Sequence, residues 1–248
     1  MVTIDLITGF LGSGKTTFLK KYAEYLMDQG LHIGILENDF GAINVDMLML
    51  HELRGDQCEL EMIAGGCDAE SHRRRFRTKL ISMRMCGYDR VLVEPSGIYD
   101  VDEFFDVLRE EPLDQWYEIG NVIAILDARL EDNLSQQADY LLASEAANAG
   151  KVILSHADAA TREQCEDTVA HLNRALEQIR CDRRIDPEKD ILQINLTDLT
   201  KEDLEEVSKC GYRLESYRKM DLENGQSFDS LFFMEEKIKP EALERAVP

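Results

Sequence analysis

Residues 9–16 read GFLGSGKT, which matches the phosphate-binding pattern G-x4-G-K-[ST]. The octapeptide lies between an expected strand at residues 2–8 and an expected helix at residues 15–29, as this pattern requires. Its glycines let successive backbone N–H groups point inward at phosphate oxygens, at the positive end of the following helix. The Lys15 ammonium would lie between the β- and γ-phosphates, and the Thr16 hydroxyl would bind Mg²⁺. The residues predicted to hold the phosphates are Gly12, Ser13, Gly14, Lys15, Thr16 and Thr17.

The rest of the chain alternates short β-branched runs with helical stretches. Further strands are expected at residues 31–37, 59–64, 88–94, 122–127, 151–155 and 191–195, and helices at 71–85, 101–110, 136–149 and 161–180. The runs Val91–Val93 and Val122–Leu126 are apolar throughout, which is typical of strands that are buried on both faces. The sequence therefore predicts an α/β fold with a doubly wound, mostly parallel sheet, as in P-loop NTPases.

A P-loop protein needs a second acidic group to orient Mg²⁺ or water. The apolar strand that contains Val91–Val93 delivers Glu94 at its C-terminal end, and Gly97 follows with an amide that can sense a γ-phosphate. Ligands of open parallel sheets bind at the C-terminal ends of strands, so we expect Glu94 near the phosphates. Glu37 and Asp39 follow another strand and begin a candidate segment whose order depends on nucleotide and Mg²⁺. The alternatives are a helix cap or solvated residue at Glu94 and a plain polar loop after Glu37.

Charge restricts the classes of partner. The 248 residues include 28 Lys+Arg and 49 Asp+Glu, for a net charge of −21. This argues against binding to nucleic acid or to an anionic membrane, since both need a basic face. Residues 68–90 are the exception, with seven basic and three acidic side chains. We interpret this basic island as a solvated helix face with internal ion pairs, or as a docking surface for an acidic client or for nucleotide phosphates.

The remaining global features predict a cytoplasmic protein. Residues 1–8 are too short for a signal peptide, and no apolar run approaches the ~20 residues of a membrane span. The six cysteines form no CxxC pair, which indicates reduced thiols. Residues 230–234 resemble a strand and residues 240–246 a helix, too little to bury a core. We therefore expect a nucleotide-binding domain at residues 1–225 and the start of a truncated second domain, or a packed tail, at 226–248.

Several of these motifs together resemble the CobW-like branch of P-loop GTPases, relatives of the accessory GTPases for urease and hydrogenase maturation. Residues 8–17 resemble the phosphate loop of that family, residues 37–41 (ENDFG) its switch segment, and residues 94–97 (EPSG) its E-x-x-G Walker B motif. Residues 65–67 (GGC) resemble the start of its G-G-C-x-C-C metal motif. The resemblance implies GTP and Mg²⁺ as cofactors, with Thr16, Asp39 and Glu94 as Mg²⁺ ligands and Lys15, Glu94 and Asp39 as catalytic residues.

The metal motif departs from the family pattern. Its second and third cysteines should fall at Ala69 and Glu70, so Cys67 stands without them. Because zinc favours several thiolate or imidazole ligands, the loss of two thiolates should weaken the site. Cys58, Glu70 or His72 are possible replacements, and the candidate ligands for zinc or another transition metal are Cys67 and His72. The alternative is a single thiol with no metal.

The base-reading motif also departs from the family pattern. The family carries N-K-x-D after the strand at residues 151–154, whereas this chain has Ser155, His156, Ala157 and Asp158. The Asp158 carboxylate can accept hydrogen bonds from N1–H and N2–H of guanine, and adenine offers no such donor pair. Ser155 lacks the amide of Asn, and His156 must replace the aliphatic stem of Lys. We expect a weakened preference for GTP, or else a helix cap at Asp158.

The function that these expectations support is slow, Mg²⁺-dependent GTP hydrolysis coupled to delivery of a transition metal to a client protein, the metal step being implied by the resemblance. The alternative is a nucleotide-dependent switch or regulatory module that has lost metal handling, which the incomplete cysteine motif favours. A small-molecule kinase shares the phosphate loop, but Asp158 and the E-x-x-G pattern argue against it. The sequence does not predict the oligomeric state.

Overall fold

The computed structural model describes residues 1–10, 12–39, 49–64, 69–95, 101–130 and 133–220. In these residues seven strands form one parallel sheet in the order β3-β2-β4-β1-β5-β6-β7. The strands are β1 (Val2–Thr8), β2 (Ile33–Asp39), β3 (Cys58–Ala64), β4 (Arg90–Pro95), β5 (Tyr117–Asp127), β6 (Lys151–Ser155) and β7 (Ile191–Gln193). The predicted parallel α/β sheet is confirmed.

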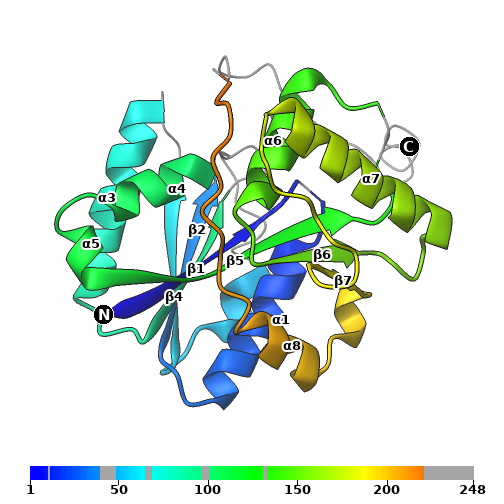
Figure 1. Ribbon diagram of the computed structural model, residues 1–248. Coiled ribbons are helices and arrows are strands. Elements are labelled where there is room, and N and C mark those ends of the chain that lie inside the picture. The colour runs from blue at the N-terminus through cyan, green and yellow to red at the C-terminus, as the bar shows by residue number, and fades with distance from the viewer. Residues whose placement is uncertain (11, 40–48, 65–68, 96–100, 131–132, 221–248) are drawn as a thin grey trace, which may run out of the picture.

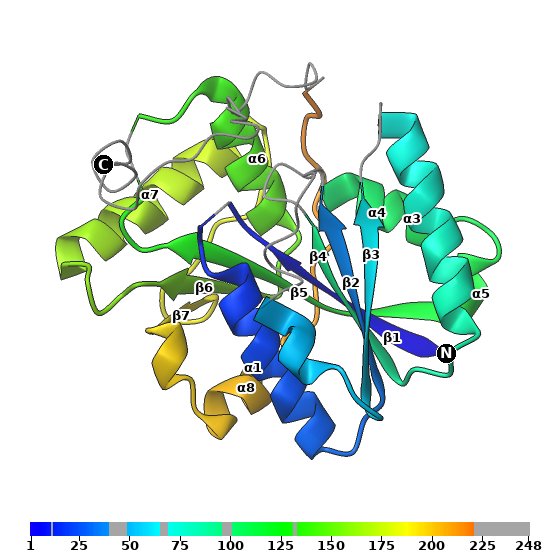
Figure 2. The same ribbon diagram turned by 180° about the vertical axis from the view of Figure 1, so that it is seen from behind.

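Helices cover both faces of the sheet (Figures 1 and 2). They are α1 (Lys15–Asp28), α3 (Ala69–Arg84), α4 (Val101–Leu108), α5 (Leu113–Trp116), α6 (Gln136–Ala147), α7 (Arg162–Gln178) and α8 (Lys201–Val207), with 3₁₀ turns at His51–Leu53 and Leu196–Asp198. Helices α1 and α8 lie on one face, and α3 to α7 lie on the other. None of the described helices has the length and apolar character needed to cross a bilayer.

The strand side chains explain this two-sided covering. Along β5, Val122, Ala124 and Leu126 join the core cluster that includes α3, α4, α6 and α7, whereas Ile123 and Ile125 join the cluster that includes α1 and α8. Successive side chains of a strand point to opposite faces, so an apolar run supplies both cores at once. The expectation that these strands are buried on both faces is therefore confirmed.

Several elements differ from the sequence-based expectation, among them the short helix α5 and the two 3₁₀ turns, which were not expected. Strand β5 begins at Tyr117 rather than at residue 122, because its first residues pair with the start of β1. Only glycine fits at position 120, since a Cβ there would lie 2.4 Å from Asp5 Oδ1. This glycine interrupts the apolar strand pattern, so the pairing is not evident from the sequence. Helix α8 was not expected, although Thr200 and Asp203 form a capping box at its start. The predicted tail elements at residues 226–248 lie outside the described residues.

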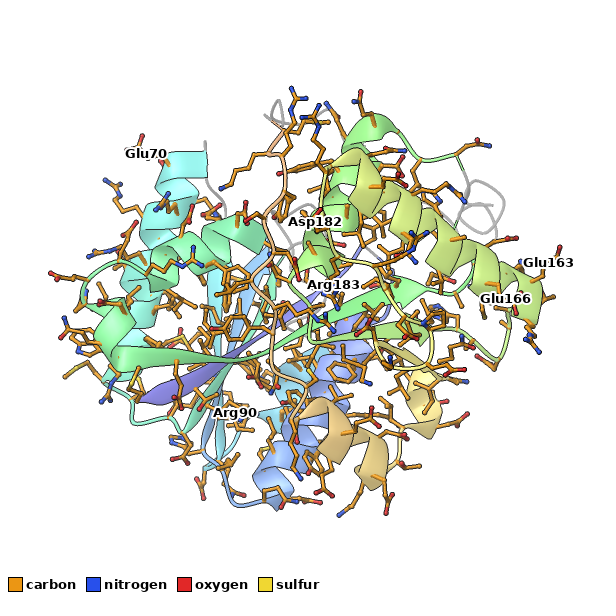
Figure 3. The ribbon with its side chains drawn as sticks, in the orientation of Figure 1. Glu70, Arg90, Glu163, Glu166, Asp182 and Arg183 are labelled. Atoms are coloured by element: carbon orange, nitrogen blue, oxygen red, sulfur yellow. The ribbon has the colours of Figure 1, made fainter. Side chains whose placement is uncertain are left out.

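A buried hydrogen-bond network ties α1, β4 and β5 to β1. The Asp5 carboxylate is fully buried and accepts from the Tyr22 hydroxyl at 2.8 Å, from Arg90 Nη1 at 3.0 Å and from the Asn121 amide N–H at 2.8 Å. Burial raises the pKa of Asp5, although the positive charge of Arg90 opposes the shift. Arg90, which begins β4, is labelled in Figure 3. The network aligns the strands whose opposite ends carry the candidate site.

Replacement of Tyr22 by Phe should lower the free energy of unfolding by about 1–3 kcal/mol, because buried polar partners lose a hydrogen bond. The Tyr22 hydroxyl donates to Asp5 and accepts from Arg90 Nη1 at 3.0 Å. Urea titration would measure the loss. Tyr25→Phe, a half-buried tyrosine on the same helix, is the matched control and should change stability little. Equal losses in the two variants would contradict a special role for the network.

Candidate nucleotide site

The loop between β1 and α1 curls because its glycines adopt conformations that other residues disfavour. Gly9, Gly12 and Gly14 have φ values of +141°, +79° and +94°. A Cβ on Gly9 would lie 2.1 Å from the carbonyl oxygen of Ile125, so the loop packs directly on β5. Gly14 caps α1 without a side-chain hydrogen bond, which leaves the first-turn N–H groups without a capping side chain. Helix N-termini of this kind attract anions such as phosphate.

Lys15 and Ser13 line the inside of this loop. Lys15 is 7% exposed, and its Nζ donates a hydrogen bond to the Phe10 carbonyl oxygen at 3.1 Å. The Ser13 hydroxyl is buried and has no hydrogen-bond partner among the described residues. The loop therefore holds a positive charge and a polar side chain at the end of β1, where a phosphate group would satisfy both.

Strand order brings Glu94 to the same place. Because β4 lies beside β1, its C-terminal end reaches the first turn of α1, where Thr16 Oγ1 donates to Glu94 Oε1 at 2.9 Å. Both side chains are buried, at 8% and 3% exposure. Gly97 lies outside the described residues. The Thr16 hydroxyl and the Glu94 carboxylate thus form one oxygen-rich cluster under the loop.

A second carboxylate, Glu37, lies beside Glu94. The two residues are register partners on β2 and β4, so their side chains point to the same face of the sheet, and Glu37 is 2% exposed. Two adjacent buried carboxylates repel each other unless a proton or a cation compensates them. A hydroxyl and two carboxylates form an oxygen donor set that suits Mg²⁺. Asp39 ends β2, but its side chain and residues 40–41 of the predicted switch segment lie outside the described part.

The predicted base-reading residues follow β6. This strand lies two places from β1 in the sheet, which corresponds to roughly 10 Å. The Ser155 hydroxyl is buried and donates to the Leu126 carbonyl oxygen of β5 at 3.1 Å, so its hydrogen is engaged within the sheet. Asp158 is exposed, and Thr161 rather than Asp158 caps α7. The alternative of a helix cap at Asp158 is therefore wrong.

His156 adopts a left-handed conformation with φ +53°, and its Nδ1 lies 3.0 Å from Asp127 Oδ2. Burial alone would raise the pKa of Asp127, but hydrogen bonds from Arg129, together with the positive charges of Arg129 and His156, lower it. An ionised carboxylate therefore anchors the imidazole at the end of β6. The ring is a flat side chain, 43% exposed, beside the expected position of the base.

The candidate transition-metal ligands are not assembled in the described residues. Cys67 lies outside them. His72 is 1% exposed, and its Nδ1 lies 3.4 Å from Glu103 Oε1 on α4. Cys58 begins β3, at the opposite end of that strand from residue 67, and burial raises its thiol pKa to about 11. Glu70, labelled in Figure 3, is exposed at the start of α3. Among the described residues, no three His, Cys, Asp or Glu side chains could hold a metal ion together.

The basic island forms internal ion pairs, as one of its two interpretations predicted. On α3, Arg73 Nη2 and Arg77 Nε lie 2.5 Å and 3.0 Å from Glu110 carboxylate oxygens, and Lys79 Nζ lies 2.8 Å from Glu61 Oε2. These side chains are 28–42% exposed, so each pair contributes little to stability. Their effect is to neutralise charge between neighbouring elements.

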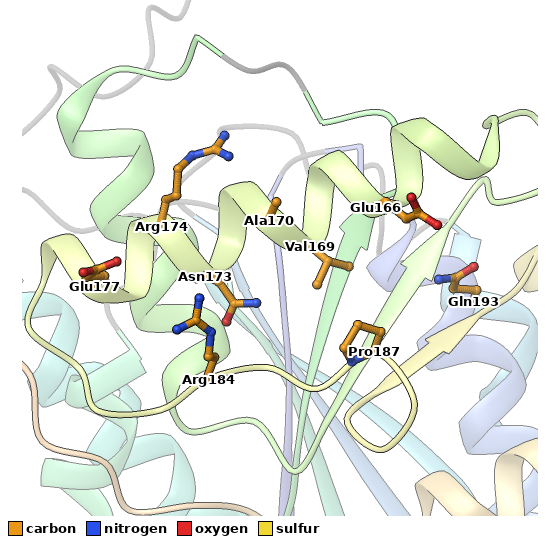
Figure 4. A pocket seen from close by; sticks show the side chains of 9 residues that line it. All are labelled: Glu166, Val169, Ala170, Asn173, Arg174, Glu177, Arg184, Pro187 and Gln193. Carbon is orange, nitrogen blue, oxygen red and sulfur yellow. The ribbon is translucent and has the colours of Figure 1, made fainter.

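A separate hollow of about 420 Å³ lies beside α7, against the segment that contains Arg184 and Pro187 (Figure 4). It is bounded by α7 and by the segment that leads to β7, and it does not include any predicted site residue. The lining residues are Glu166, Val169, Ala170, Asn173, Arg174, Glu177, Arg184, Pro187 and Gln193.

Sequence reasoning missed Glu145, which the fold brings to the phosphate loop. Glu145 lies on α6, is fully buried, and faces the Thr8 hydroxyl, the Gly9 amide and the Lys15 ammonium. Burial raises its pKa to about 8, although Lys15, Gly9 and Thr8 oppose the shift. The available signal was a single acidic residue in the run LLASEAANA at residues 141–149. Helical spacing alone does not say what that buried face contacts.

Comparison with known proteins agrees with the fold. The family model described as CobW/HypB/UreG, nucleotide-binding domain, matches residues 3–185. A solved structure of the LAO/AO transport system kinase is similar to this chain with a TM-score of 0.52 and 18% identity, over 83% of this chain and 56% of that one. At this identity the likeness shows the fold alone.

Curated relatives include two proteins of Escherichia coli (strain K12). The chain is 30% identical to the zinc chaperone YjiA over 186 residues, which cover 69% of this chain and 55% of YjiA. It is 28% identical to the zinc chaperone YeiR over 164 residues, which cover 66% of this chain and 49% of YeiR. The chain thus spans about half the length of these relatives. Because the family model matches most of the sequence, from β1 through α7, the chain belongs to the CobW/HypB/UreG family of nucleotide-binding domains.

Proposed function

We propose that this chain binds GTP with Mg²⁺, hydrolyses it slowly, and couples the nucleotide cycle to the handling of a transition metal. The observation that carries the proposal is the buried hydrogen bond from Thr16 to Glu94 under a glycine-rich loop that also holds Lys15. The loop supplies positive charge and N–H groups, and the cluster beneath it supplies oxygen ligands. These are the two halves of a site for a nucleoside triphosphate with its divalent cation.

One residue of the site would stabilise charge on the phosphates, and the others would hold the Mg²⁺ ion. Lys15 would leave the Phe10 carbonyl and bind phosphate oxygens, where its charge stabilises the transferred phosphoryl group. Thr16 and Glu94 would hold Mg²⁺, with Asp39 as a further ligand. The ion, when bound, neutralises charge on the phosphates. No arginine finger can be assigned from the sequence, so we expect a slow rate.

Asp158 would select guanine. Its carboxylate is exposed after β6 and caps no helix, so it can accept two hydrogen bonds from the Watson–Crick edge of guanine. The His156 ring, held by Asp127, would replace the aliphatic shelf of a lysine. Since Ser155 donates to the sheet and offers the base no amide, the preference for GTP should be modest.

The metal would be cargo rather than a resident cofactor. The relatives named zinc chaperones favour zinc, with Cys67 and His72 as proposed ligands and a metalloprotein as the proposed client. The five cysteines in the described part carry free thiols, in keeping with a cytoplasmic setting.

A nucleotide-dependent regulatory module without metal handling is the second candidate. The contact between His72 and Glu103 favours it, because it involves one of the two proposed zinc ligands.

Replacement of Asp158 by Asn should weaken GTP binding about tenfold or more, since a charged hydrogen-bond acceptor contributes about 1.5–3 kcal/mol. ATP binding should be unchanged. Calorimetry with both nucleotides and excess Mg²⁺ would measure this. Asp167→Asn, an exposed carboxylate on α7, is the control and should alter neither affinity. A preference for ATP in the unmodified chain would contradict the GTPase proposal.

Replacement of Cys67 by Ser should abolish competition for Zn²⁺ against a colorimetric chelator, because Cys67 supplies the thiolate ligand of the proposed site. Cys86→Ser, at an exposed thiol after α3, is the matched control and should retain Zn²⁺. If the two variants retain Zn²⁺ equally, Cys67 is not a ligand. GTP affinity that is indifferent to zinc in all three proteins would favour the regulatory module.

A further inference from the structure

The buried carboxyl of Glu145 is the strongest feature near the loop that the proposed function does not use. In Figures 1 and 2 the connection that follows β1 lies beside α6. Glu145 is a fully buried residue of that helix. The groups opposite the carboxyl are the Thr8 hydroxyl, the Gly9 amide and the Lys15 ammonium. All three belong to the end of β1, the loop or the start of α1.

A structural role explains this carboxyl poorly. Neither Glu145 oxygen has a well-formed hydrogen bond among the described residues, although the Gly9 amide and the Thr8 hydroxyl approach it closely enough to lower its pKa. A buried carboxyl without partners costs stability, and an apolar side chain in α6 would avoid that cost. Residues that break a local packing rule in this way concentrate at functional sites.

The position of Lys15 connects Glu145 to the nucleotide. Lys15 Nζ donates to the Phe10 carbonyl oxygen in this structure, while its charge acts on the Glu145 carboxyl. A neutral carboxyl leaves the ammonium available to phosphate. An ionised carboxylate in the same buried place would attract the ammonium strongly, because the local dielectric constant is low.

We propose that Glu145 is a positioning residue that controls where Lys15 points, so that nucleotide binding requires the protonated carboxyl and weakens when that proton leaves. The inference rests on the proposed function, because it assumes that Lys15 binds phosphate. A bound triphosphate adds negative charge near Glu145 and favours the protonated form further. Nucleotide binding and protonation of Glu145 therefore favour each other.

The charges around Glu145 are few in the described residues. Lys15 of α1 is the charged group that acts on it, whereas the β1 and loop contacts, Thr8 and Gly9, are uncharged. On α6 itself the preceding titratable side chains are Tyr140 and Asp139, and Asp139 pairs with His171 of α7 at 2.7 Å. Burial raises the pKa of Glu145 to about 8, so the change in nucleotide affinity should be measurable at mildly alkaline pH.

Calorimetric titration with GTP and Mg²⁺ from pH 6.5 to 9.5 would test the proposal. In the unmodified chain the affinity should fall about tenfold for each unit by which the nucleotide raises the Glu145 pKa. Glu145→Gln, an uncharged side chain of the same shape, should lack this fall and bind more tightly than the unmodified chain at pH 9. Glu163→Gln, on the exposed face of α7 and labelled in Figure 3, should follow the unmodified chain. Subtraction of the profiles removes the ionisation of the nucleotide itself.

Thermal unfolding supplies a second readout. The folded-state pKa lies above the ordinary value of 4.5, so the unmodified chain loses stability as pH rises from about 4.5 to about 8. Glu145→Gln should therefore melt higher than the unmodified chain above pH 8, and the gap should close toward pH 5. A Gln variant that melts lower or fails to fold overturns the proposal, as do parallel affinity profiles in all three proteins. If the unmodified chain binds no nucleotide at any pH, the proposed function itself is wrong.

Discussion

The hydrogen bond between the Thr16 hydroxyl and the Glu94 carboxylate joins the two parts of the candidate site. It is possible because β1 and β4 are parallel neighbours, so the loop after one strand and the acid at the end of the other meet at the same edge of the sheet. The chain runs from β1 outward to β3, returns to β4, and continues through β5 to β7 on the other side. Ligands of open α/β sheets bind where the direction of winding reverses in this way.

Local charge, rather than the net charge of −21, governs what this edge can bind. The Gly14 cap leaves first-turn N–H groups of α1 without a capping side chain, and Lys15 adds a full positive charge. Below them lie Glu37 and Glu94, which favour a cation. Positive groups above and negative groups below suit a phosphate group and a cation together, even in an acidic protein.

Much of this arrangement could be predicted from the sequence. The GFLGSGKT pattern fixed the loop, and the apolar runs indicated a sheet buried on both faces, because each feature depends on local spacing. The start of β5 could not be predicted, since Gly120 interrupts the strand pattern. Glycine is required there because a larger side chain would clash with Asp5 on another strand. Glu145 was missed for a similar reason: the groups that face it come from β1, the loop and α1, far away in the sequence. Features that depend on contacts between distant segments need the folded structure.

The magnesium dependence of GTP affinity in the unmodified chain and in Glu94→Gln tests the central claim most directly. If Thr16 and Glu94 hold the cation, Mg²⁺ should strengthen GTP binding to the unmodified chain by about tenfold or more, since hydrogen bonds and ligands at charged groups contribute about 1.5–3 kcal/mol. In Glu94→Gln most of that gain should disappear, while binding without Mg²⁺ should remain. An equal gain in both proteins, or none in the unmodified chain, would contradict the account.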